Sequence, residues 1–197
     1  QGEEITIAEA LKKEGYATGA IGKWHLGDQP QHAPINNGFD SFLGTPLSND
    51  SPPFEQKFHK IDTLSQNPDF RHFDVPLLRG TNVVERPVDQ STLTKRYTEE
   101  AIRFMNENKK KPFFIYFAHN FPHVPLFASP QFKGKSPRGR YGDVVEELDW
   151  SVGEVLNYLK REKLDKNTFV IFTSDNGPWL NRRENGGSAG LFRDGKG

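Results

Sequence analysis

The sequence predicts an α/β fold in which a largely parallel sheet is flanked by helices. Helical stripes alternate with short apolar runs along the chain, as in folds that interleave helices and strands. Two of the runs are continuously apolar, which is typical of strands covered on both faces. A length of 197 residues suits one domain or a large part of one.

Composition excludes several classes of protein. The 26 basic and 26 acidic residues cancel, which argues against a general nucleic-acid binder. With no cysteine, these residues hold no disulfide, thiolate metal site or unmodified cysteine nucleophile. No run approaches the roughly 20 apolar residues of a membrane span. Oligomeric state is not predicted by any of these features.

The first elements have clear local signals. Thr6 and Glu9 form a capping box, which predicts a helix that runs to about Glu14 and stops at Gly15. Residues 16–21 are small, apolar and partly β-branched, so we expect a strand there.

The rest of the chain divides into three parts. Residues 28–92 are rich in Pro, Asn, Asp, Ser and Gly, and we expect a loop-rich insertion with at most short strands. Residues 93–177 are expected to form a βαβ-type region, and residues 181–197 a glycine-rich loop. The elements expected in the middle part are helices around 97–105 and 144–159 and strands at 113–118 and 168–172.

Polar residues follow each predicted strand at the point where it ends. In a parallel sheet these groups share one edge, where α/β proteins bind ligands. Cations, imidazoles and a carboxylate would together suit an oxyanion with charge developing on a leaving oxygen. The residues concerned are Lys23 and His25 after the first strand, His119 and His123 after the second, and Asp175 and Asn176 after the third.

Each of these groups taken alone has a plainer interpretation. A lysine or histidine after a strand is commonly a surface residue, and Asp-Asn-Gly is commonly a turn. His119 and His123 have the spacing of a zinc-binding pair, but that pair requires a helix, which Pro122 opposes. We therefore expect His119 to pack in a loop.

The motifs together resemble the formylglycine-dependent sulfatases, the arylsulfatase-like branch of the alkaline phosphatase superfamily. The run from Gly15 to His25 is similar to that family's second signature along its whole length. Further matches follow in the same order along the chain: Gly38-Phe39-Asp40, Gly44-Thr45-Pro46, His123-Val124-Pro125, Ser174-Asp175-Asn176-Gly177, and Gly186-Gly187 through Gly195-Lys196-Gly197.

The resemblance implies a role for each matched residue in cleaving a sulfate ester. Lys23 would bind sulfate and the formylglycine nucleophile, and His25 would contact the nucleophile's geminal diol and help expel sulfate. Ser48 would line the pocket. His123 would lie near the ester oxygen and Lys196 near sulfate, and either could protonate or stabilise the leaving alcohol.

The resemblance also implies a metal ion, with Asp175 and Asn176 as two ligands of Ca²⁺ or Mg²⁺. Oxygen ligands suit such hard ions. Zinc-using phosphatase relatives commonly have a histidine where Asn176 stands, so Asn176 favours the sulfatase interpretation.

One departure from the family pattern limits what this chain can do. The family's nucleophile, a Cys or Ser oxidised to formylglycine in a C/S-x-P-S-R motif, has no counterpart here. We expect it, with the first aspartate pair of the metal site, upstream of Gln1, in one catalytic domain shared with residues 1–197. The chain alone is then expected to hydrolyse no aryl sulfate.

Two other functions are compatible with the same residues. One is a phosphonate or phosphodiester hydrolase of the same superfamily, and the other is a non-catalytic remnant that binds sulfated glycans. The expected partner is a small sulfate ester or a sulfated glycan, which the basic loop from Lys133 to Arg140 could meet, although a solvated loop is the plainer interpretation. Family habit places the parent protein in the periplasm, outside the cell or in the lysosome.

Overall fold

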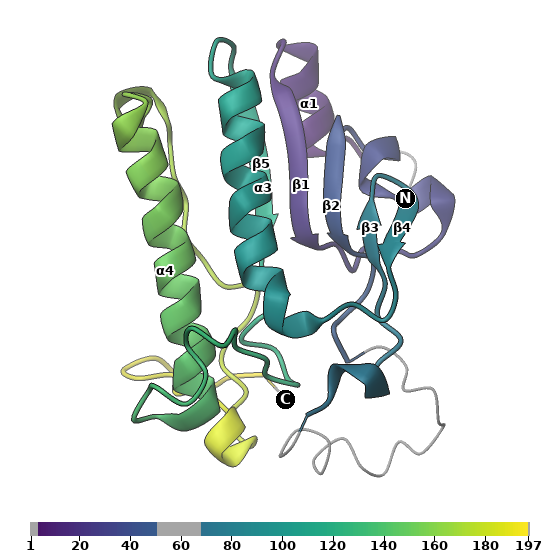
Figure 1. Cartoon of the computed structure of the whole chain (residues 1–197). Coiled ribbons are helices and arrows are strands. Elements are labelled where there is room, and N and C mark those ends of the chain that lie inside the picture. The colour runs from purple at the N-terminus through teal and green to yellow at the C-terminus, as the bar shows by residue number, and fades with distance from the viewer. Residues whose placement is uncertain (1–3, 51–67, 197) are drawn as a thin grey trace.

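The computed structural model describes residues 4–50 and 68–196, and its centre is a five-stranded sheet. The strand order is β4-β3-β2-β1-β5 (Figure 1). Three strands, β1 (Ala17–Lys23), β2 (Ser41–Thr45) and β5 (Phe113–Ala118), run parallel to one another. An antiparallel hairpin of β3 (Leu77–Arg79) and β4 (Asn82–Glu85) extends the β2 edge. The α/β class is confirmed, with a mixed sheet whose parallel part is its centre.

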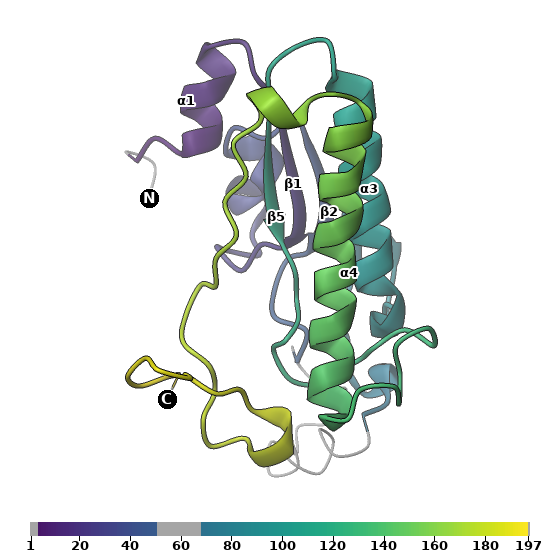
Figure 2. The same cartoon turned by 90° about the vertical axis from the view of Figure 1, so that its left-hand side faces the viewer.

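Helices cover both faces of this sheet, as Figures 1 and 2 show. Helix α1 (Ile7–Lys13) lies on one face and has the predicted capping box between Thr6 and Glu9. The opposite face is covered by α3 (Leu93–Asn108) and α4 (Gly139–Arg161). Both long helices coincide with the apolar stripes that predicted them.

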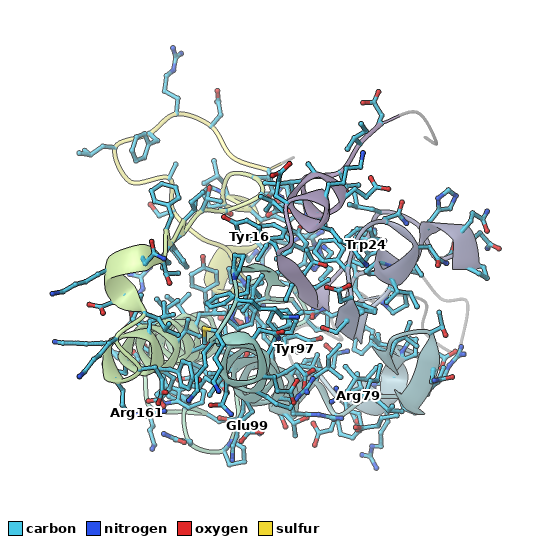
Figure 3. All side chains as sticks on the ribbon, turned by 90° about the horizontal axis from the view of Figure 1, so that it is seen from above. Tyr16, Trp24, Arg79, Tyr97, Glu99 and Arg161 are labelled. Atoms are coloured by element: carbon cyan, nitrogen blue, oxygen red, sulfur yellow. The ribbon has the colours of Figure 1, made fainter. Side chains whose placement is uncertain are left out.

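The main core lies between the sheet and these two long helices. Tyr97 of α3 is fully buried there and lies near the middle of the molecule in the view from above (Figure 3). A smaller cluster on the α1 side includes Trp24, whose ring meets Phe39 edge-on with centroids 5.9 Å apart. Its indole N–H donates to the His32 carbonyl at 2.7 Å. Trp24 therefore holds the segment after β1 against the sheet.

The stretch predicted to be loop-rich, residues 28–92, is described in part, over residues 28–50 and 68–92. Besides β2, β3 and β4, that stretch contains only 3₁₀ helices of three residues each among its described residues: Pro30–His32, Pro34–Asn36, Phe70–His72 and Gln90–Thr92. Residues 51–67 of the predicted insertion lie outside the described residues.

Two of the strand predictions need correction. β5 is a strand, but its side chains are only partly buried, because β5 is the outer strand of the described sheet. Residues 168–172 do not form a strand, and Phe169 and Phe172 are 88% and 80% exposed. Strand propensity is realised only when a neighbouring strand accepts the backbone hydrogen bonds. This segment has no such neighbour among the described residues.

In the described part of the chain, no helix has the length and apolar character needed to cross a membrane.

Candidate functional site

The parallel strands bring their carboxyl ends, and the residues that follow them, to one edge of the sheet. Lys23 at the end of β1 lies opposite Thr45 at the end of β2, and Gly22 lies opposite Ala118 at the end of β5. The loops that continue from β2 and β5 carry Ser48 and His123. The loops that follow β1, β2 and β5 therefore begin side by side at this edge.

Ser48 and His123 are direct neighbours across the two loops. Their Oγ and Nδ1 atoms are 3.4 Å apart, and the same Nδ1 lies 2.6 Å from the Val124 carbonyl oxygen. A carbonyl can only accept, so this contact places a proton on Nδ1 and makes Nε2 of the neutral ring the acceptor. Burial lowers the pKa of His123, and Lys23 and Lys196 lower it further, whereas Asp50 raises it.

Lys23 and His25 form the second part of the site. Burial lowers the pKa of Lys23, and the nearby Lys196 lowers it too, while Asp175 and Asp50 act in the opposite direction. Burial and the charge of Lys23 likewise lower the pKa of His25. His25 has an exposed side chain and a backbone φ of 55°, a left-handed conformation uncommon outside glycine.

The C-terminal tail returns to the same edge and contributes Lys196. Its backbone N–H donates to the Pro178 carbonyl at 2.9 Å, and its ammonium lies 4.8 Å from the centre of the Trp179 ring. The Trp179 ring also lies 5.9 Å from the His123 ring, centroid to centroid. Lys196 acts electrostatically on Lys23, His25 and His123, so the tail belongs to the site.

The predicted metal ligands are only partly organised. Asp175 is exposed and acts electrostatically on Lys23 and His25, which places it at the site. Asn176 is exposed too, and its backbone carbonyl accepts a hydrogen bond from the Ser174 hydroxyl at 2.8 Å. Within residues 4–50 and 68–196, no three His, Cys, Asp or Glu residues are grouped so that they could hold a metal ion.

Two residues at this edge were not among the predicted ones. Asp50 acts electrostatically on Lys23, His25 and His123. Its position two residues after Ser48 is the sequence feature that could have identified it as a site residue. Trp179 had no distinguishing pattern in the sequence, because the contacts that matter come from segments distant along the chain.

Buried amides hold the loops of the site in place. Asn120 accepts a hydrogen bond from the Tyr97 hydroxyl at 2.9 Å and donates to Thr45 Oγ1 at 3.0 Å. Asn49 donates to Gln90 at 3.1 Å and to the Pro125 carbonyl at 3.0 Å. Buried hydrogen bonds of this kind specify one arrangement, because each unpaired partner would be costly.

His119 packs in a loop, as expected. Its ring lies 4.3 Å from that of Phe117, and Nε2 is 3.2 Å from the Ser151 hydroxyl. Its Nδ1 is sealed from solvent with no hydrogen-bond partner among the described residues. Burial lowers the pKa of His119 to about 4.

Comparison with known proteins shows which family this chain resembles. The family described as Sulfatase matches residues 1–197. The chain is 42% identical to N-acetylgalactosamine-6-sulfatase of Mus musculus over 205 residues, which covers 98% of this chain and 37% of that protein. It is 39% identical to human arylsulfatase A over 201 residues, covering 99% of this chain and 40% of that protein.

A solved structure shows the same fold. The crystal structure of a sulfatase from a Pseudoalteromonas species superposes with a TM-score of 0.74 at 27% identity, covering 95% of this chain and 40% of that one. The chain thus spans somewhat over a third of the length of the curated relatives it matches. Sequence and fold agree, and the chain belongs to the Sulfatase family.

Proposed function

We propose that this chain carries part of the active site of a sulfuric ester hydrolase that cleaves sulfate monoesters. The observation that carries the proposal is the gathering of Lys23, Lys196, His25 and His123 at the carboxyl edge of the parallel strands. Neither ammonium forms a salt bridge with any residue that the structure describes. Both are therefore available to an anion, and partial burial of Lys23 strengthens its attraction for one.

In this proposal the two lysines hold the sulfuryl oxygens and Ser48 lines the pocket. Formylglycine, supplied by another part of the protein, would provide the oxygen nucleophile. The surroundings fit such a group, because Lys23 and His25 come from one strand end and the side chain of His25 is exposed. His25, with its lowered pKa, is neutral at neutral pH and can accept the proton released when sulfate is expelled.

We propose Lys196, rather than His123, as the group that stabilises the leaving alcohol. His123 has a lowered pKa, and its Nδ1 proton is directed at Val124 O. Its Nε2 is then a hydrogen-bond acceptor, which cannot donate to the ester oxygen without first being protonated. An ammonium group carries three donors and needs no such step.

For the metal ion, we propose only two of its protein ligands. Asp175 and Asn176 offer the oxygen atoms that Ca²⁺ or Mg²⁺ prefer, but Ca²⁺ takes 6–8 oxygens and Mg²⁺ about six. The described residues alone do not complete such a site. We propose these two residues as contributors to it, and none of the steps above depends on the ion.

We propose a sulfated sugar as the substrate class. The relative from Mus musculus is named for an N-acetylgalactosamine 6-sulfate. Lys133 and Arg140 of the basic loop line a pocket of about 580 Å³, which offers a sugar chain apolar surface and charges of both signs. Its other lining residues include Asp69, Asp89, Phe70, Leu126 and Phe127. An exported or lysosomal location of the protein is likewise a proposal that follows from the family.

The decisive experiment compares paired esters. The complete protein, with its formylglycine formed, should hydrolyse 4-nitrophenyl sulfate in preference to 4-nitrophenyl phosphate and bis(4-nitrophenyl) phosphate. The 197-residue chain alone should hydrolyse none of them. Preference for a phosphorus ester would favour a phosphohydrolase, and glycan binding without turnover by the complete protein would favour the non-catalytic alternative. Either result would overturn the proposal.

A further inference from the structure

Trp179 occupies a position that its sequence context does not suggest. Its ring is contacted by the Arg182 guanidinium, 3.7 Å from the ring centre, and by the Lys196 ammonium at 4.8 Å. The His123 imidazole lies 5.9 Å away at an interplanar angle of 47°. One side chain thus joins three segments of the site: the loop after Asp175, the C-terminal tail and the loop after β5.

The tail that carries Lys196 is held through its backbone, because Gly195 packs so closely on Pro178 that a Cβ atom there would lie 2.2 Å from the Pro178 carbonyl oxygen. Leu191 and Phe192 are essentially fully exposed, so the tail is not anchored by a buried apolar side chain at these positions. The Lys196 N–H donates to the Pro178 carbonyl at 2.9 Å and fixes the backbone beside that packing. Backbone contacts alone leave the long lysine side chain free to rotate. The contact with the Trp179 ring is the described interaction that orients its ammonium.

The energetics of this contact suit a positioning role. A cation within about 6 Å of an indole face is attracted by the ring quadrupole, and the attraction is greater for tryptophan than for other aromatic rings. Because the ring holds the cation without a carboxylate, the ammonium keeps its full charge for another anion. A salt bridge at the same place would neutralise it.

We propose that Trp179 is a positioning residue that holds the Lys196 ammonium beside His123, where the leaving alcohol departs. This inference rests on the proposed sulfatase function. Trp179 itself need not touch the reacting atoms, and its effect passes through Lys196. Losing the indole should therefore weaken stabilisation of the leaving oxygen more than it weakens binding.

A series of aryl sulfates with leaving phenols of graded acidity tests this role in the complete enzyme. Poorly acidic phenols leave with more charge to be stabilised, so they depend most on Lys196. Trp179→Leu should lower kcat/KM roughly 10- to 100-fold for the least acidic phenol and only a few-fold for 4-nitrophenol. Trp179→Phe, which keeps a π face, should recover much of the loss. Trp150→Leu, on α4 against Phe132, is the matched control and should not change the dependence on phenol acidity.

A double-mutant cycle separates this role from a merely structural one. In a Lys196→Ala background, Trp179→Leu should add no further dependence on phenol acidity, because the group through which it acts is gone. An equal loss for every phenol, or an undiminished effect without Lys196, would overturn the inference. If the unmutated enzyme hydrolyses no aryl sulfate at all, the proposed function fails instead. Should the leucine variant not fold, Trp179→Met, which fills apolar space without a π face, supplies the same comparison.

Discussion

Gly22 on β1 lies against Ala118 on β5 so closely that a Cβ atom on Gly22 would overlap the Ala118 carbonyl oxygen. The φ of Gly22 is 105°, a conformation that side-chain-bearing residues rarely adopt. Gly22 immediately precedes Lys23. The close approach of these two strands therefore fixes the backbone immediately before Lys23.

Gly22→Ala should consequently destabilise the protein by several kcal/mol, or prevent folding, because backbone rather than a flexible side chain must move. Gly15→Ala is the matched control. Gly15 also has a positive φ, of 83°, but a Cβ there meets no described atom within 4 Å, so its cost should be only about 1 kcal/mol of conformational strain. Urea unfolding of both variants measures the difference, and equal destabilisation would contradict the account.

Lys23→Met should abolish most of the proposed hydrolysis while preserving the fold. It keeps the length of the side chain and removes the charge that meets the sulfuryl oxygens, so kcat/KM should fall roughly 10²- to 10³-fold. Lys95→Met, on the exposed surface of α3, makes the same chemical change away from the site and should retain activity. Steady-state assay of 4-nitrophenyl sulfate in the complete enzyme distinguishes them. Comparable activity in the two variants would show that the Lys23 charge does not contribute to hydrolysis.

His119 should make the stability of the protein depend on pH in mildly acidic solution. Its folded-state pKa of about 4 lies below the ordinary value of 6.5, so between these values the unfolded chain binds a proton that the folded chain does not. Stability therefore falls as pH drops from 6.5 to 4, by about 1.4 kcal/mol per pH unit and about 3 kcal/mol in all.

His119→Leu should flatten that dependence, as measured by urea unfolding at several pH values. The difference between variant and parent at pH 8 reports lost packing and hydrogen bonding alone, since the imidazole is neutral in both states there. An unchanged slope between pH 6.5 and pH 4 would show that other groups cause it.

Asn120→Leu should cost about 1–3 kcal/mol of stability, because it leaves the buried Tyr97 hydroxyl without its acceptor. Thr45 retains its bond to the Leu47 carbonyl at 3.0 Å, so the loss on that side should be small. Adding Tyr97→Phe removes the stranded hydroxyl, and the double variant should be less destabilised than the sum of the single variants. Asn36→Ala, which removes an exposed amide bond to the Pro30 carbonyl, should change stability little. Strict additivity of Asn120→Leu and Tyr97→Phe would mean that the two side chains act independently.

Local signals in the sequence determined those elements whose causes are local. The Thr6–Glu9 capping box begins α1, and the apolar stripes of α3 and α4 define two helices, because capping and amphipathic periodicity act within a few residues. The sequence also allowed us to predict that the polar residues after β1 and β5 share one edge, since parallel strands point their carboxyl ends the same way.

Only the tertiary structure decided features that depend on distant segments. Residues 168–172 have strand propensity but stay exposed, because a strand requires a partner and none of the described strands lies beside them. Asp50 and Trp179 join the site through contacts with residues far along the chain, which no spacing rule encodes. Residue type and periodicity are written in the sequence, whereas the distances and burial that turn these side chains into a site arise when the packed chain brings them together.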